Sequence, residues 1–270
     1  MINYVINLDR SPERLEIFTA RALACNLSFE RIPAIDALEM LDGEFNTWHS
    51  KCQICKPMTR GEVACLLSHR KAWKQIVAAR ASWAFIAEDD ILFSTDAERC
   101  FSSTDWLPAS LHVIRAETAF TRIEMSGKVL ARQGDHVVRR LKSNHTGTAG
   151  YFVSQEGARR LTAFTENRCE PVDRLMFHPS QASRDIRIGQ VEPALCIQDH
   201  HFLPKEIRRE AVNTIGAVPR LANAKTKGPK RNVVSRIVRE IGRARRRARH
   251  AVVVGSRISV FRKVGINHQE

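Results

Sequence analysis

The sequence predicts an α/β fold with a central, mostly parallel sheet, and two observations carry that prediction. Near the N-terminus a short apolar strand, an amphipathic helix and a second strand follow one another within about 35 residues, the spacing of a parallel β-α-β unit. Farther along, a long helix leads directly into an apolar strand whose last residues are acidic. The 270 residues, 43% of them apolar, suffice for one large domain of this class or two small ones.

The N-terminal segment holds the three elements of the first pattern. YVINLD at 4–9 is typical of a short buried strand, and FERIPAID at 29–36 is typical of a second one. Between them, Ser11 stands where a helix N-cap belongs, Pro12 takes the first helical position, and apolar residues recur at helical spacing over residues 11–26. We therefore expect a strand, a helix and a parallel strand in that order.

The next elements bring acidic residues to the end of a strand. Residues 37–60 look like a loop, whereas residues 59–80 predict the longest helix, because apolar side chains such as Val63 and Trp73 recur on one face. This helix leads into WAFIAEDDILF at 83–93, an apolar strand with an acidic interruption.

Three adjacent carboxylates, Glu88, Asp89 and Asp90, form that interruption. They repel one another, and burying one of them unpaired costs several kcal/mol. Mg²⁺ or Mn²⁺ would remove the repulsion, because oxygen ligands suit these ions and substrate phosphates can complete their coordination. The alternative is a strand end whose acids face water or cap the next helix. The carboxyl end of a strand is where open α/β sheets bind ligands, which favours the metal.

The second half of the chain predicts further strands and one helix. LHVIRAET at 111–118 indicates a strand, and residues 145–164 indicate a glycine-bearing loop followed by a strand and a helix. Residues 185–198 indicate one or two more strands.

The cysteines and the N-terminal sequence indicate in which cellular compartment the protein is found. Seven scattered cysteines argue against a secreted disulfide framework. Cys52 and Cys55 form a C-x-x-C that is either part of a zinc site or a pair of free thiols in a loop; a second ligand pair is missing. The chain has no uncharged apolar run of the roughly 18 residues that a transmembrane helix needs, and no leader resembling a signal peptide, so we expect a cytoplasmic protein.

The net charge of +14 is concentrated near the C-terminus. Residues 203–263 contain 18 Lys and Arg against three acids, and Val234, Ile237, Val238 and Ile241 recur there at helical spacing. We therefore divide the chain into a domain at 1–202 and a basic linker with an amphipathic helical tail at 203–270. Such a helix is typical of a segment that lies on an anionic membrane surface. Nucleic acid would also attract the charge but not the apolar stripe, so we expect no specific nucleic-acid partner.

Four sequence blocks together resemble a known family. YVINLDRSPERLE at 4–16, GEVACLLSHRKAW at 61–73, AFIAEDDILF at 84–93 and GTAGYFVSQEGARRL at 147–161 are similar, in order and spacing, to glycosyltransferase family 25. That family includes bacterial lipopolysaccharide and lipooligosaccharide galactosyltransferases, and animal collagen galactosyltransferases are relatives. The resemblance runs from about residue 2 to 200, and four ordered blocks are far more specific than one.

The resemblance implies a GT-A-like nucleotide-sugar-binding fold and a metal-dependent, inverting transferase. The donor would be a UDP-sugar, often UDP-galactose, and the acceptor a lipid-linked oligosaccharide of lipopolysaccharide or lipooligosaccharide. With the basic tail, this places the protein on the inner face of the cytoplasmic membrane. A noncatalytic lipid- or nucleic-acid-binding protein that reuses the fold is the rival hypothesis; the intact acidic triplet favours the enzyme.

The resemblance also implies roles for individual residues. Glu88, Asp89 and Asp90 match the EDD motif that takes the place of D-x-D and would bind Mn²⁺ or Mg²⁺, with His200 or His201 as a further ligand. The donor would lie near residues that match the first two blocks, namely Asn7, Asp9, Arg14, Ser68 and His69. Local alternatives are a helix cap at Asp9, a structural histidine at His69 and ordinary loop histidines at 200 and 201.

An inverting transfer needs a general base on the acceptor side. Asp173 in EPVDRLMF matches a PVD of the family and is the preferred candidate, with Glu117 second. A helix N-cap is the alternative role for Asp173.

Overall fold

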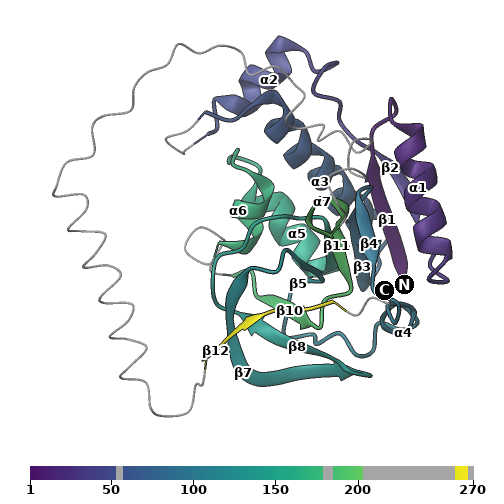
Figure 1. Ribbon diagram of the computed structural model, residues 1–270. Coiled ribbons are helices and arrows are strands. Elements are labelled where there is room, and N and C mark those ends of the chain that lie inside the picture. Colours follow the sequence, from purple (N-terminus) through teal and green to yellow (C-terminus); the bar gives the residue numbers. More distant parts are fainter. Residues whose placement is uncertain (53–56, 179–184, 203–258, 267–270) are drawn as a thin grey trace.

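A nine-stranded mixed sheet forms the centre of the protein (Figure 1). The computed structural model describes residues 1–52, 57–178, 185–202 and 259–266. The strand order is β12-β7-β8-β10-β5-β9-β3-β1-β2. Its strands are β1 Ile2–Asn7, β2 Glu30–Pro33, β3 Trp83–Glu88, β5 Val113–Arg115, β7 Arg122–Gln133, β8 His136–Leu141, β9 Gly150–Ser154, β10 Ile188–Glu192 and β12 Ser259–Lys263.

A smaller sheet and the helices complete the described part of the chain. The second sheet has the order β4-β11-β6, with β4 Ile91–Phe93, β11 Cys196–Gln198 and β6 Glu117–Thr118. The helices are α1 Pro12–Leu23, α2 Asp42–His49, α3 Arg60–Ala78, α4 Glu98–Phe101, α5 Gln155–Phe164, α6 Val172–Phe177 and α7 Asp199–Phe202. Among the described residues, no helix is both long enough and apolar enough to cross a bilayer.

The N-terminal β-α-β unit is confirmed. Strand β1 pairs in parallel with β2 and with β3. Its side chains alternate between two cores, because Tyr4 packs with α3, α5 and α6 on one face of the sheet and Val5 packs with α1 and α4 on the other (Figure 1). Ser11 occupies the N-cap position of α1, although its side chain makes no capping hydrogen bond.

Helix α3 is anchored at its start and along one face. Thr59 and Glu62 form a reciprocal capping box, in which the Glu62 amide donates to Thr59 Oγ1 over 3.2 Å and the Thr59 amide donates to Glu62 Oε2 over 2.7 Å. The inner face of the helix is fully buried through Val63, Leu66 and Trp73. The helix therefore presents its N-terminal turns at a fixed place beside the ends of β1 and β3.

The prediction of a mostly parallel sheet is wrong. Of the eight strand pairings in the nine-stranded sheet of the described residues, three are parallel and five are antiparallel. Strand β9 runs antiparallel between β3 and β5, and β7 and β8 form a hairpin around Gly134 at φ +56°. A tight turn can join antiparallel strands, whereas parallel strands need a crossover of a dozen or more residues.

Two further expectations differ from the structure or fall outside it. Residues 37–60 are not all loop, since they contain α2, a helix that has no fully buried residue and packs against the core through the partly buried Phe45 and Trp48. The amphipathic tail helix lies outside the described residues, which resume at 259. From there β12 pairs antiparallel with β7 along the edge of the large sheet, and Ala194 forms a bridge with Ile266.

Candidate functional site

A cleft of about 270 Å³ lies at the carboxyl ends of β1 and β3. Its wall continues along the loop after β2, the first turns of α3 and the junction of β11 with α7. Eight of the residues predicted from the sequence line it: Asn7, Arg14, Ser68, His69, Glu88, Asp89, Asp90 and His200. The structure thus brings together residues that are far apart along the chain, from Asn7 to His200, at the sheet edge where open α/β sheets bind ligands.

The three adjacent acids have different partners. Asp89 forms an ion pair with Arg14 of α1 and accepts a 2.7 Å hydrogen bond from Asn7 Nδ2. Burial raises the pKa of Asp89 despite the nearby Arg14 guanidinium. Because the contacts with Arg14 and Asn7 hold its carboxylate against α1 and β1, Asp89 has the most extensive side-chain contacts with the protein among the three acids.

Glu88 points to the other side, toward α3. Its Oε1 accepts a 2.8 Å hydrogen bond from Thr148 Oγ1 and lies 3.4 Å from His69 Nε2. Burial acts to raise the pKa of Glu88, but the contacts with His69 and Thr148 outweigh it and hold the pKa below its usual range. Glu88 is therefore ionised near neutral pH.

Asp90 faces α7. Its carboxylate accepts a 3.2 Å hydrogen bond from Gln198 Nε2 and lies 3.9 Å from Arg14. One oxygen of Asp90, one of Asp199 and one ring nitrogen of His200 lie within 4.8 Å of one another. Burial first, and then the charge of Glu88, raise the pKa of Asp90 to about 8.

This last group fits a divalent cation. Two carboxylates and an imidazole are donors that Mn²⁺ or Mg²⁺ accepts, and the open side of the cleft leaves positions for other ligands. The raised pKa of Asp90 shows that its negative charge is poorly tolerated among the neighbouring acids, a cost that a bound cation removes. Asp199 was not predicted from the sequence. Its signal was its place directly before the two histidines, at the end of a strand.

The donor-side residues are held by a network centred on Asn7. Asn7 is 2% exposed; its Nδ2 also donates to the Ser11 carbonyl over 3.0 Å, and its Oδ1 accepts from Arg31 Nε over 3.0 Å. Ser68 Oγ accepts a 2.9 Å hydrogen bond from the Ile35 amide and so fixes the loop that forms the cleft wall. These contacts make Asn7 and Ser68 supports of the cleft wall.

Asp9 does not line the cleft. Its side chain is 76% exposed and pairs with Arg31. The structure therefore separates Asp9 from Asn7 and Arg14, with which the sequence motif groups it.

The two candidate bases also lie outside the cleft lining, and both are attached to the loop before β9. The Gly147 amide donates to Asp173 Oδ2 over 3.3 Å, while the Ala149 amide donates to Glu117 Oε1 over 3.1 Å. Gly147 has φ +88°, a backbone conformation that favours glycine, and a Cβ there would lie only 3.0 Å from Glu117 Oε1.

Glu117 is almost fully buried and is paired with Arg115 over 3.3 Å. Burial raises its pKa to about 7. That pKa suits a general base, but Glu117 lies in the interior of the protein. Asp173 also accepts from the Arg174 amide over 2.8 Å at the start of α6.

The remaining predicted metal ligands are the two adjacent histidines and the cysteine pair, and the structure describes the histidines but not both cysteines. The rings of His200 and His201 lie with centroids 3.9 Å apart and are tilted by 41° to one another, and His200 lines the cleft. Cys55 lies outside the described residues, so zinc binding by Cys52 and Cys55 stays a prediction.

Comparison with known proteins links this site to one family. A model described as Glycosyltransferase family 25 (LPS biosynthesis protein) matches residues 1–176. The lacto-N-neotetraose biosynthesis glycosyltransferase LgtB of Neisseria gonorrhoeae is 28% identical over 278 residues, which cover 97% of this chain and 100% of LgtB. The lipooligosaccharide biosynthesis protein lic2B of Haemophilus influenzae is 28% identical over 221 residues, covering 77% of this chain and 79% of lic2B.

A solved structure offers a distant likeness. The crystal structure of a glycosyltransferase involved in the glycosylation of the major capsid of PBCV-1 has a TM-score of 0.37 and 7% identity, covering 73% of this chain and 92% of that one.

Proposed function

The chain belongs to glycosyltransferase family 25, and from that premise we propose that it transfers a hexose, galactose, from a UDP-sugar to a saccharide acceptor of lipopolysaccharide or lipooligosaccharide. We further propose a GT-A-like arrangement, metal dependence and inversion at the anomeric carbon. The observation that carries the proposal is the convergence of Asp90, Asp199 and His200 in a cleft at the carboxyl ends of β1 and β3.

Asp90, Asp199 and His200 are the residues that would hold the cation. When bound, Mn²⁺ or Mg²⁺ would neutralise the donor diphosphate and stabilise UDP as a leaving group. Glu88 and Asp89 contribute charge to the same end of the cleft, but their other partners hold them away from this group. Arg10 and Arg14 line the same cleft and add positive charge on the side of α1.

Donor binding is assigned to the wall formed by β1, α1 and the first turns of α3. Asn7 fixes the Asp89 carboxylate, and Ser68 fixes the Ile35 amide, so the wall is rigid before the donor arrives. Such preorganisation lowers the ordering cost of binding. Asp9, exposed beside Arg31, is the donor-side candidate with the weakest support.

Asp173 remains the proposed general base, accepting the proton of the acceptor hydroxyl as that oxygen attacks the anomeric carbon. It is joined through Gly147 to the loop whose next residue, Thr148, hydrogen-bonds Glu88 in the cleft. Glu117 is the alternative; its pairing with Arg115 in the interior favours a structural role.

The proposed acceptor is linked to a lipid, so the enzyme would meet it at a membrane surface. We propose that the basic segment at 203–263 holds the enzyme on the anionic inner face of the cytoplasmic membrane, where a lipid-linked acceptor would be found.

The test is turnover of a panel of UDP-sugars by the full-length protein with Mn²⁺ and no acceptor, followed by transfer to a saccharide acceptor. We expect slow hydrolysis of UDP-galactose, abolished by chelation, and a loss of about a hundredfold or more in Asp90→Asn, since a metal supplies several kcal/mol of charge stabilisation. Asp135→Asn, in the exposed β7–β8 turn, is the matched control. Full activity of Asp90→Asn in the presence of chelator would refute metal dependence, and no turnover of any UDP-sugar would favour the noncatalytic alternative.

A further inference from the structure

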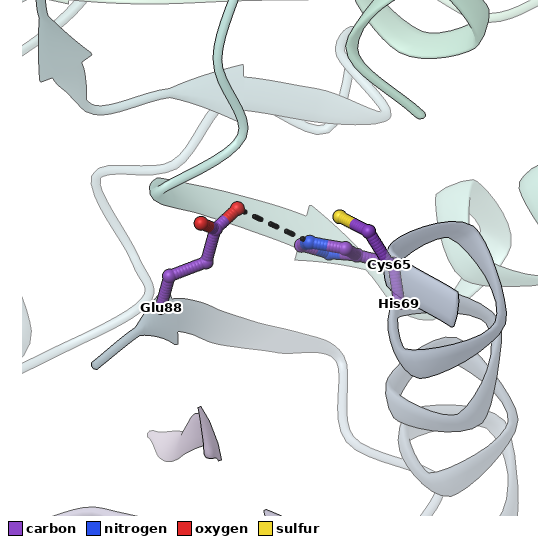
Figure 2. A group of neighbouring side chains, drawn as sticks. All are labelled: Cys65, His69 and Glu88. Carbon is purple, nitrogen blue, oxygen red and sulfur yellow. Dashed lines mark ion pairs between the residues drawn. The ribbon is translucent and has the colours of Figure 1, made fainter. Parts of the chain in front are cut away.

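A second set of metal-binding side chains lies at the end of the cleft beside α3. Cys65 and His69 are one helical turn apart on α3, and Glu88 closes the group from the end of β3; Figure 2 shows the three side chains pointing toward one another. One ligand atom from each, a sulfur, a ring nitrogen and a carboxylate oxygen, lies within 4.8 Å of the other two. The proposed function uses none of these atoms as a metal ligand.

The separation between His69 and Glu88 matches a metal site better than a strong hydrogen bond. His69 Nε2 and Glu88 Oε1 are 3.4 Å apart, longer than the roughly 2.7–2.9 Å of a charge-assisted hydrogen bond. Two ligands of a tetrahedral zinc ion, each about 2.0–2.1 Å from the metal, are about 3.3–3.4 Å apart. The pair is thus already spaced as two corners of such a site.

The other side of the His69 ring is oriented as in known metal sites. His69 Nδ1 lies 2.9 Å from the Tyr151 hydroxyl, which also accepts a 2.9 Å hydrogen bond from Trp73 Nε1. A ligating histidine ordinarily gives its second ring N–H to an oxygen, which fixes the ring and selects the tautomer. A cation that displaces the Nε2 proton would find Nδ1–H donating to Tyr151 and the lone pair of Nε2 directed toward Glu88 and Cys65.

The donor set separates this group from the one around Asp90. A thiolate, an imidazole and one carboxylate are ligands that zinc prefers, whereas oxygen-rich groups suit magnesium and manganese. Burial raises the pKa of the Cys65 thiol well above its ordinary value, and the carboxylates of Glu88 and Asp173 raise it further. Those same carboxylates favour a cation, and Cys65 lines the cleft, so an ion can reach it from solvent.

We propose that Cys65, His69 and Glu88 form a three-ligand site for Zn²⁺, separate from the Asp90 group, with its fourth position open to water. On binding, the Cys65 thiol loses its proton to solvent and the thiolate binds the metal, with no change of oxidation state. Because the site lies in the wall of the donor cleft, its occupation opposes donor binding, so zinc inhibits the enzyme even when the Asp90 group holds its own cation.

Cobalt(II) substitution tests the site in the full-length protein. A thiolate ligand gives Co²⁺ a near-ultraviolet sulfur-to-metal charge-transfer band, which the oxygen-rich group cannot produce. We expect this band in the wild type, loss of the band with at least a hundredfold weaker binding in Cys65→Ser, and retention in Asp90→Asn. The double variant Cys52→Ser/Cys55→Ser is the matched control and should keep the band, since it leaves all three proposed ligands in place.

Two outcomes would overturn the proposal. One is a wild-type protein that binds Co²⁺ without the band; the other is a band that survives Cys65→Ser and disappears with Cys52 and Cys55. A measurement on the wild type avoids the risk that a variant misfolds. Zn²⁺ should slow the alkylation of Cys65 by iodoacetamide, which peptide mass spectrometry can follow. An unchanged alkylation rate would also refute the site. These readouts need no turnover, so they stand apart from the proposed transfer reaction.

Discussion

Asp90 provides the sharpest test of the acidic end of the cleft, because its charge should make the metal-free protein sensitive to pH. Its pKa is raised to about 8 in the folded protein by burial and by Glu88, against 3.8 for an aspartate exposed to solvent, as in the unfolded chain. Between these two values the folded chain holds a proton that the unfolded chain has lost. The unfolding free energy must therefore fall as the pH rises through this window, and the loss is complete once the pH passes about 8.

The magnitude follows from the linkage relation. One proton held only by the folded state changes the unfolding free energy by about 1.4 kcal/mol per pH unit. Between about pH 5.5 and about pH 7.5, the ionisation of Asp90 should thus lower the unfolding free energy of the wild type by about 3 kcal/mol. Asp90→Asn lacks this group, so its unfolding free energy should not fall by this amount. Glu117, whose pKa is also raised, to about 7, titrates in both proteins and cancels in the comparison.

Chemical denaturation of both proteins at the two pH values, in chelator, measures the difference. Saturating Mn²⁺ should then stabilise the wild type most at the higher pH, where the cation need not displace a proton, and should leave Asp90→Asn unchanged. Equal pH dependence of the two proteins in chelator would show that Asp90 ionises freely. In that case the electrostatic argument for a cation beside Asp199 and His200 fails.

Three further predictions concern other parts of the chain. Thr59→Ala should lower the unfolding free energy by about 1 kcal/mol in denaturant titrations, because it removes the capping box of α3; an unchanged midpoint would contradict that role. Asp173→Asn should reduce transfer by about a hundredfold with UDP-sugar binding preserved, as calorimetry can show; unchanged turnover would move the base to Glu117. Glutamine at the five arginines of 243–249 should weaken binding to anionic vesicles in sedimentation assays but not binding to neutral ones, and equal anionic binding would refute the membrane anchor.

The fold could be predicted from the sequence where burial leaves a local pattern. Helix α3 carries both a capping box and a fully buried face, and β1 and β3 are short runs of buried residues. Helix α2 has no fully buried residue and contacts the core only through Phe45 and Trp48, and two apolar positions are too few to establish a helical period. Strand β7 buries few of its twelve residues and pairs with β8 through register shifts, so strict alternation is absent there as well.

The direction of the strands was predicted wrongly for a different reason. An apolar strand such as β9 has the same local pattern whichever way it runs, and its antiparallel place between β3 and β5 is set by contacts far away in the sequence. The prediction of parallel strands extended the N-terminal β-α-β unit to the whole sheet. It holds for the pairings of β1 with β2 and β3 and for that of β5 with β10, but not for the other five pairings of the sheet in the described residues.

The candidate site likewise combines residues that a local sequence pattern predicts with partners that are far away along the chain. The acidic triplet is a local feature, and its position at a strand end could be predicted. Its partners could not, because Asn7 and Arg14 are 82 and 75 residues away from Asp89 along the chain. Cys65 was missed because a single cysteine in a helix gives no signal until the fold brings other ligands beside it, and Asp199 was missed although it directly precedes the two histidines.

The three acids can be neighbours because the fold gives each a different counterpart. Arg14 offsets part of the burial cost at Asp89, whose pKa is still raised, whereas His69 and Thr148 hold the pKa of Glu88 below its usual range. Asp90 is contacted by a neutral amide and by the more distant Arg14, and its pKa is the one raised to about 8. A cation therefore stabilises Asp90 more than either neighbour. It follows that the three acids should differ when neutralised one at a time: loss of the Asp90 charge should affect metal binding, loss of Asp89 the packing of α1, and loss of Glu88 the orientation of His69.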